Sequence, residues 1–139
     1  MNIHPYLNFA GNTEEAFNFY KSVFGGEFIN VNRFSENPDP NVPESVKDKI
    51  LHITLPVGNT FLMGSDAPKE MGFTVNQGNN NYIMLSPDSR EETKRLFDGL
   101  SAGGEIEMDL QDMFWGDYFG SFTDKFGVKW MINFSKTQH

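Results

Sequence analysis

The sequence FYKSVFGGEF at residues 19–28 ends in a pattern that recurs in the second half of the chain. Apolar side chains at helical spacing run into Gly25-Gly26-Glu27, and Gly103-Gly104-Glu105 follows 78 positions later. Glycine tolerates the left-handed conformation found just past a helix C-terminus, so both triplets predict helix ends. Leu7 and Leu85 are also 78 positions apart, which indicates a duplicated unit.

The first half of the chain has the pattern of a strand, a helix and three further strands. In order, these are a strand at 3–9, a helix capped by Asn12, and strands at 27–34, 49–57 and 60–65. Glu15 complements the start of the helix, and Gly58-Asn59 predicts a two-residue hairpin turn. Residues 35–48 contain Pro, Asn and Asp, which favour a loop.

The second half repeats this order of elements. Its predicted elements are a strand at 80–86, a helix capped by Asp88 or by Ser89 with Glu92, and strands at 106–112, 118–123 and 128–134. We therefore predict an α+β fold of tandem βαβββ modules, 1–66 and 80–135, joined by a linker at 67–79 within one domain of residues 1–139. The alternative is an ordinary α+β domain in which the two helix ends coincide by chance.

Composition narrows the function classes. The chain has 139 residues, of which 38% are hydrophobic and 14 are Phe, which is enough for one packed core. Its net charge of -8 repels nucleic acid and anionic membranes, and its lack of Cys excludes disulfides, thiolate nucleophiles and Cys-based metal sites. The N-terminal sequence has no signal-peptide pattern and no apolar run approaches membrane-spanning length, so we expect a cytoplasmic protein.

Strand alternation assigns side chains to two faces of the predicted sheets. The face toward the helices is predicted to hold Leu51, Ile53, Leu55, Ile83, Leu85, Val128, Trp130, Ile132 and Phe134, with Ile50 pointing away. The other face is predicted to hold His4, Tyr6, Asn8, His52, Thr54, Met63, Tyr82, Met84, Met131 and Asn133. Such a mixture of aromatic, Met and polar groups is typical of a small-molecule cavity. A sheet face covered by the other half of the chain or by a second subunit is the alternative.

Four segments resemble the PhnB-like branch of the vicinal-oxygen-chelate superfamily, which has the glyoxalase/bleomycin resistance/dioxygenase fold. They are the opening 4–9, the helix end 19–27, the strand pair 52–55 and 61–66, and the closing stretch 115–133. The resemblance covers nearly the whole chain. It implies paired βαβββ modules whose mixed, curved sheets surround a shared cavity, often in a homodimer.

The resemblance also implies where a metal would bind. Metal-dependent glyoxalases of the superfamily place one His or Glu ligand on the first and last strand of each module, and the matching positions here are His4, Met63, Tyr82 and Met131. Thioether sulfur is a poor ligand for Mg, Mn, Ni or Zn, and a catalytic site needs about three N or O ligands. Only His4 is a good ligand, so we predict no glyoxalase-type metal and no cofactor.

Residues with catalytic potential are few. His4 and His52 lie on the predicted cavity face and are candidates for a general acid or base, although a hydrogen-bonded structural role is the alternative for each. Trp115 is a candidate for a flap over a ligand, with core or dimer packing as its alternative. Asp66, Asp112, Asp117 and Asp124 are predicted at strand ends or turns, where Asp is common.

Three functional hypotheses follow. The first is a metal-free protein that binds a small, partly aromatic or apolar molecule. Its predicted ligand-binding residues are His4, Tyr6, His52, Met63, Tyr82, Met84, Trp115 and Met131. The second is a lyase- or isomerase-type enzyme that uses His4 and His52 with a different metal or acid-base site. The third is a dimeric structural or regulatory module. The sequence has no Gly-x-Gly-x-x-Gly motif, which counts against a methyltransferase or dehydrogenase.

Overall fold

The structure is a computed structural model that describes residues 1–136. The chain divides into two compact units, Met1–Asn76 and Gln77–His139, and each unit contains one helix and one four-stranded sheet. The boundary between them falls inside the segment 67–79 that the sequence analysis assigns to a linker. That the two modules act as one domain stays a prediction.

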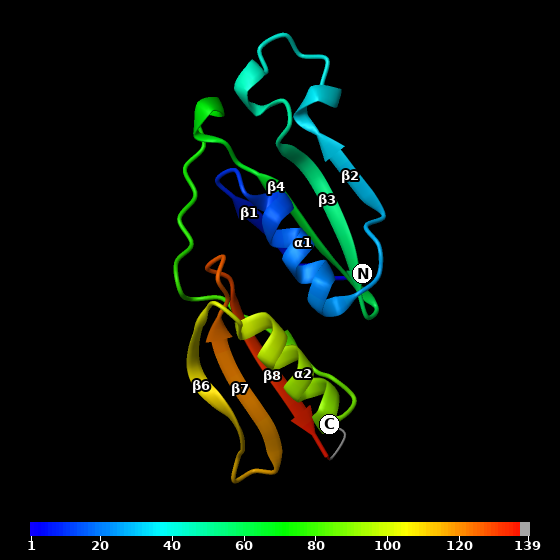
Figure 1. Cartoon of the computed structure of the whole chain (residues 1–139), viewed down its shortest axis with the longest axis vertical. Coiled ribbons are helices and arrows are strands. Elements are labelled where there is room, and N and C mark those ends of the chain that lie inside the picture. The colour runs from blue at the N-terminus through cyan, green and yellow to red at the C-terminus, as the bar shows by residue number, and fades with distance from the viewer. Residues whose placement is uncertain (137–139) are drawn as a thin grey trace. The chain divides into compact units, whose positions relative to one another are not determined.

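The first unit is a βαβββ module (Figure 1). Its main elements are β1 (Tyr6–Phe9), α1 (Thr13–Phe24), β2 (Asn30–Arg33), β3 (Ile50–Val57) and β4 (Thr60–Asp66). The strand order is β1-β4-β3-β2, in which β1 runs parallel to β4 and the other pairs are antiparallel. The module is therefore a mixed, curved sheet, as predicted.

The second unit repeats this topology (Figure 1). Its elements are β5 (Ile83–Leu85), α2 (Arg90–Ser101), β6 (Glu105–Asp112), β7 (Asp117–Thr123) and β8 (Lys129–Ser135). The strand order β5-β8-β7-β6 matches the first sheet position by position, with β5 parallel to β8. The predicted α+β fold and the order of its elements are thus confirmed, and the helix-ending Gly25 and Gly103 both have positive φ, at 80° and 78°.

Three strands are at least three residues shorter than the sequence predicts. The strand predicted at 3–9 begins at Tyr6, because the preceding Pro5 has no N–H for a ladder, although its carbonyl still accepts from the Met63 amide. The strands predicted at 27–34 and 80–86 are reduced to Asn30–Arg33 and Ile83–Leu85. All three are edge strands, which pair on one side only.

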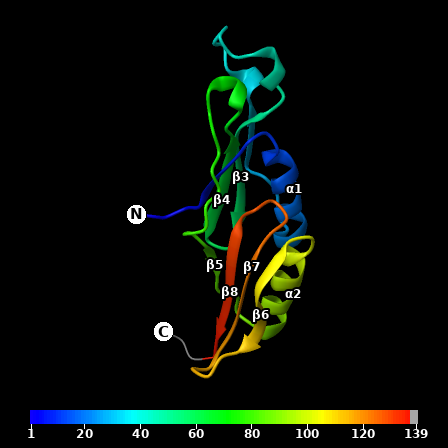
Figure 2. The ribbon, with the colours of Figure 1, turned by 90° about the vertical axis from the view of Figure 1, so that its left-hand side faces the viewer.

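In the first unit, α1 covers one face of the sheet (Figure 2). The side chains buried between helix and sheet are Ala16, Phe17, Tyr20, Val23, Ile53, Leu55 and Leu62. The ring of Phe17 lies directly over Gly64 of β4, where a Cβ would come within 2.7 Å of the ring. The opposite face of the sheet has no helix over it within this unit.

In the second unit, α2 covers one face of its sheet in the same way (Figure 2). The buried side chains are Leu96, Phe97, Leu100, Phe122, Trp130 and Ile132, which confirms the predicted helix side for the last strand. Here Phe97 lies over Gly120 of β7, where a Cβ would come within 2.6 Å of the ring.

The two helices begin in different ways. In α2, the Ser89 hydroxyl accepts from the Glu92 amide at 3.1 Å, as the sequence predicts. In α1, Asn12 occupies the N-cap position, as predicted, but its side chain makes no capping hydrogen bond. Asp66, at the end of β4, caps that helix instead, because it accepts from the amide and the hydroxyl of Thr13 at 3.1 and 2.8 Å.

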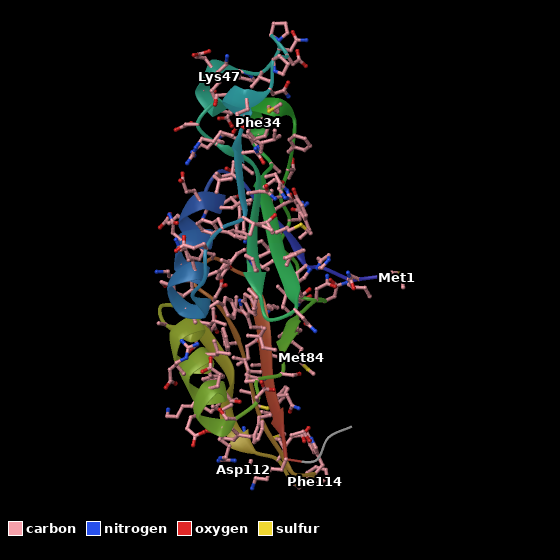
Figure 3. All side chains as sticks on the ribbon, turned by 90° about the vertical axis from the view of Figure 1, so that its right-hand side faces the viewer. Met1, Phe34, Lys47, Met84, Asp112 and Phe114 are labelled. Atoms are coloured by element: carbon pink, nitrogen blue, oxygen red, sulfur yellow. The ribbon has the colours of Figure 1, made fainter. Side chains whose placement is uncertain are left out.

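The predicted loop 35–48 contains structure of its own. Short 3-10 helices span Phe34–Glu36 and Glu44–Val46, and another, Lys69–Met71, lies in the segment after β4. A small apolar cluster holds this region together, formed by Phe34, Val42 and Val46 with Met71 packed against it (Figure 3 labels Phe34 and Lys47). The proline-rich composition conceals this cluster, because its members do not follow a regular period.

The assignment of faces at the start of β3 is wrong. Ile50 is fully buried and Leu51 is 36% exposed, the reverse of the prediction. The pairing between β2 and β3 shifts register here, since Asn32 pairs with His52 and Arg33 pairs with Ile50. A bulge inserts one residue and reverses the alternation beyond it, which a simple period of two does not anticipate.

Candidate functional site

The sheet face opposite α1, here called the first open face, is organised in rows of side chains across the strands. Directly paired residues point to the same side of a sheet. The central row contains Tyr6, Met63, Thr54 and Asn30, one from each strand. The polar row, two residues further along the strands, contains Asn8, Ser65, His52 and Asn32. Tyr6 is 46% exposed, whereas Thr54 is buried among its neighbours.

A chain of hydrogen bonds links the central row to the polar row. The Tyr6 hydroxyl lies 3.2 Å from Nδ1 of His52, and Nε2 of the same ring lies 2.9 Å from the Thr54 hydroxyl. A neutral imidazole has one donor and one acceptor nitrogen, whereas each hydroxyl can serve as either. This series of hydrogen bonds can therefore present the Tyr6 hydroxyl to a ligand as donor or as acceptor.

His4 lies at the other end of the first open face. Its Nδ1 accepts from the Phe61 amide at 3.1 Å and lies 3.0 Å from the Thr60 hydroxyl. In the neutral ring, Nδ1 as acceptor places the proton on Nε2. The imidazole also stacks on the Phe61 ring, with centroids 5.1 Å apart. With Pro56, which pairs with Phe61, these side chains form the aromatic row.

The sheet face opposite α2, here called the second open face, has a different chemistry. Its central row contains Met84, Met131, Ser121 and Met108. Met84 is 56% exposed and lies on the side of the sheet away from α2 (Figure 3). Thioethers thus occupy positions where the first open face has a phenol, a thioether and an amide.

Beside this row, an acidic side chain joins a lysine and a tyrosine. Glu107 accepts from the Tyr82 hydroxyl at 2.9 Å and from the Lys129 ammonium at 2.5 Å, and Lys129 also donates to Thr123 at 2.9 Å. The hydrogen bond from Lys129, assisted by the one from Tyr82, lowers the pKa of Glu107 below its usual value. Donation to Glu107 raises the pKa of Tyr82 in turn.

The predicted site residues therefore fall into two sets and one outlier. The structure brings His4, Tyr6, His52 and Met63 onto the first open face. It brings Tyr82, Met84 and Met131 onto the second. Trp115 lies in the turn between β6 and β7, 54% exposed, with its ring 4.9 Å from that of Phe114, which Figure 3 labels at this hairpin end.

Sequence reasoning missed several members of these faces, among them two asparagines and a glutamate. Asn30 and Asn32 belong to the first open face, and their alternation with Val31 was a signal that they share a side. Which side they share depends on the pairing of β2 with β3, which the sequence does not reveal. Glu107 was missed because the bulges in β6 obscure its alternation.

Two of the aspartates predicted at strand ends or turns are buried structural groups. Asp66 accepts from the Ile50 amide at 2.8 Å in addition to its two bonds with Thr13. Asp124 accepts from the Trp130 indole at 2.8 Å and from the amides of two residues in its own turn. Charge-assisted hydrogen bonds of this kind stabilise a carboxylate away from water, so both side chains are committed to the fold.

The donor set does not fit the metal site of the superfamily's glyoxalases. The four matching positions provide one imidazole, two thioethers and one phenol, and the His4 Nδ1 already accepts hydrogen bonds. Within residues 1–136, no three His, Asp or Glu side chains are grouped to hold a metal ion. A divalent ion would lack the oxygen and nitrogen ligands that it requires.

Two further surface observations concern the described residues. An open depression of about 490 Å³ lies in the second unit, lined by Gln77, Gly103, Gly104, Glu105, and residues 123–127. None of the predicted site residues lines it. Neither helix in residues 1–136 has the length and apolar character needed to cross a bilayer.

Comparison with known proteins gives a consistent family assignment. The family described as 3-demethylubiquinone-9 3-methyltransferase matches residues 1–133. Protein YjdN of Escherichia coli (strain K12) is 37% identical over 152 aligned positions, which cover 99% of this chain and 98% of that protein.

Solved structures agree. Protein PA1353 from Pseudomonas aeruginosa is 40% identical, with a TM-score of 0.86 over 97% of this chain and 98% of that one. A Bacillus cereus PhnB protein, described as a putative 3-demethylubiquinone-9 3-methyltransferase, is 28% identical, with a TM-score of 0.76 over 97% and 100% of the two chains. A glyoxalase/bleomycin resistance protein/dioxygenase family enzyme from Burkholderia phytofirmans PsJN, 15% identical over 93% and 95% of the chains with a TM-score of 0.61, shares the fold.

Proposed function

Because this chain belongs to the PhnB-like branch of the vicinal-oxygen-chelate superfamily, we propose that it binds a small organic molecule on the first open face without a catalytic metal. The observation that carries the proposal is the Tyr6–His52–Thr54 hydrogen-bond chain, exposed at its Tyr6 end, beside the Met63 thioether. Binding sites combine apolar contact area with a few oriented polar groups, and this row offers both.

The methyltransferase description of the family is not the function we propose. The chain lacks the Gly-x-Gly-x-x-Gly sequence of nucleotide-binding turns, and neither unit has the parallel sheet that such a turn requires. Fold alone does not determine activity, so the site's own chemistry is the better guide.

Methionine methyl groups provide a direct test. The seven Met residues include Met63 on the first open face and three on the second, so NMR of ¹³C-methyl-Met protein separates the two surfaces. We expect phenol, benzamide or indole at millimolar concentration to shift the Met63 signal. Tyr6→Phe should reduce the shift, whereas Tyr118→Phe, on the α2 side of the second sheet, should not. A Met63 signal unmoved by all three probes would refute the proposal.

A second candidate is an enzyme that uses His52 as an acid or base. The observation that favours it is the position of the imidazole between two hydroxyl groups, a geometry that can pass a proton. Elemental analysis of the purified protein separates the candidates. Stoichiometric Ni, Zn, Mn or Fe, lost in a His4→Ala, His52→Ala double variant, would favour the enzyme.

We also propose that the protein is a homodimer, as the family resemblance implies, and that it is cytoplasmic. Light scattering of the purified chain tests the assembly. A mass of one chain, near 15.8 kDa, at all concentrations would refute it.

A further inference from the structure

The three rows of the first open face differ in polarity along the strand direction. The aromatic row holds His4, Phe61 and Pro56. The polar row holds Asn8, Ser65, His52 and Asn32. A ligand lying along the strands would therefore contact rings at one end and amide and hydroxyl groups at the other.

None of the side chains in these rows is Lys, Arg, Asp or Glu. At their margin, the carboxylate of Glu36 accepts from the Asn32 amide at 3.1 Å and from the Arg33 backbone at 2.6 Å. Moving a charged group from water onto such a surface loses hydration without a countercharge. The surface thus disfavours ligands with a formal charge.

The polar groups nevertheless retain hydrogen-bonding capacity. The Asn8 carbonyl accepts from Ser65 at 3.0 Å, which leaves its two N–H donors, and the proton on Nε2 of neutral His4 is a further donor. The Tyr6 hydroxyl can donate or accept, as described above. Uncharged hydroxyl and amide groups match this mixture of donors and acceptors.

The second open face contrasts with this arrangement. Both carboxylate oxygens of Glu107 are occupied, one by Tyr82 and one by Lys129, and Lys129 has a second acceptor in Thr123. The charges of Glu107 and Lys129 therefore satisfy one another.

We propose that the ligand of the first open face is an uncharged ring compound with a hydroxyl or amide group at one end. This inference rests on the proposed function and specifies its ligand class. The ring lies over Tyr6 and Phe61, and the polar end reaches the polar row.

Three probes that share a phenol ring test the ligand class. They are neutral 4-hydroxybenzamide, anionic 4-hydroxybenzoate and cationic tyramine, each titrated at pH 7 while the Met63 methyl signal is followed. We expect 4-hydroxybenzamide to bind with a Kd at least about ten-fold lower than either charged probe. Equal or tighter binding of a charged probe would overturn the ligand class but not small-molecule binding. Failure of all three to move Met63 would overturn both.

A charge introduced into the central row provides a matched control. Asn30→Asp places a carboxylate beside Thr54 on an exposed edge strand, and Asn18→Asp makes the same change on exposed α1, on the other side of the sheet. Asn30→Asp should lower the Kd of tyramine relative to that of 4-hydroxybenzamide by about three-fold or more, and Asn18→Asp should leave the ratio unchanged. An equal effect of both variants would refute binding at this row.

Discussion

The two units reach the same topology with different packing at matching positions. In the row where helix meets sheet, the first unit pairs Leu7 with Gly64 and Ile53, and Phe17 fills the space above the glycine. The second pairs Leu85 with Ile132 and Gly120, so the glycine has moved to the neighbouring strand. The helix aromatic over it, Phe97, is the counterpart of Phe19 at the repeat spacing of 78 positions, not of Phe17.

The ion pair between helix and edge strand also differs in its residues between the two units. Glu14 of α1 pairs with Arg33 at the end of β2, at 2.7 Å. Arg90 of α2 pairs with Asp112 at the end of β6, also at 2.7 Å and with the charges exchanged. What is preserved is the contact between helix start and edge strand, while the residues that make it are not. A duplicated fold therefore constrains where a contact lies more strongly than which side chain supplies it.

The largest loss of stability should come from removing Asp66, which caps α1 although it is distant from that helix in the sequence. Asp66→Ala removes three hydrogen bonds and leaves the buried amides of Thr13 and Ile50 without their acceptor. We expect a loss of about 3 kcal/mol in the free energy of unfolding, measured by urea denaturation followed by circular dichroism. Asp109→Ala, at an exposed position of β6, is the control. A loss below about 1 kcal/mol would mean that water replaces the carboxylate.

The glycine that lies under a helix ring in each unit predicts the next largest loss of stability. A methyl group at Gly64 or Gly120 would collide with Phe17 or Phe97, so each Gly→Ala variant should lose about 2 kcal/mol of stability. The collisions are with specific rings. Phe17→Leu should therefore rescue part of the Gly64→Ala loss and none of the loss from Gly120→Ala.

The reciprocal double variants complete this test. Phe97→Leu should rescue Gly120→Ala only partly, because the Leu110 backbone also lies 3.1 Å from the added methyl. Equal rescue by either leucine at both sites would indicate a general loosening of the core. The differences between single and double variants measure the coupling.

Much of the fold could be predicted because its signals are local. The Gly-Gly pair after each helix, the Gly58-Asn59 turn and the Ser89 cap each act within a few residues, and the structure has all of them. The cap at Asp66 is separated from Thr13 by 53 positions, and no local pattern indicates it. The bulges could not be predicted for a related reason, because a bulge is defined only by the pairing of two strands.

The candidate site was predictable to the extent that it follows strand alternation. His52 and Met63 lie on the side that the alternation assigns to them. The hydrogen bond between Tyr6 and His52 depends on strands that are not neighbours, so composition gave no indication of it. Trp115 was grouped with the site because loops on a rigid scaffold often carry binding residues, and it does lie between the two predicted strands, in the turn that contains Gly116 with φ 102°.

The different N-terminal caps of the two helices predict a smaller difference in stability loss. Ser89→Ala removes a side-chain acceptor for the Glu92 amide and should lower the stability by about 1 kcal/mol. Asn12→Ala occupies the corresponding position of α1, where the side chain makes no capping bond, and should have almost no effect. Both are measured by urea denaturation. Equal losses would show that Asn12 caps the helix in solution.

The smallest effect concerns acid stability of the second unit, which contains both Trp residues and can be followed by their fluorescence. The pKa of Glu107 is lowered in the folded state by its hydrogen bond from Lys129. The resulting stabilisation is present above the unfolded value of about 4.5 and is lost as the pH falls through the lower folded value. Glu107→Gln should therefore flatten the decline of stability below about pH 4.5, whereas Glu91→Gln, exposed on α2, should not. If both variants keep the wild-type slope, solvent screens the pair and the second open face owes no stability to its charges.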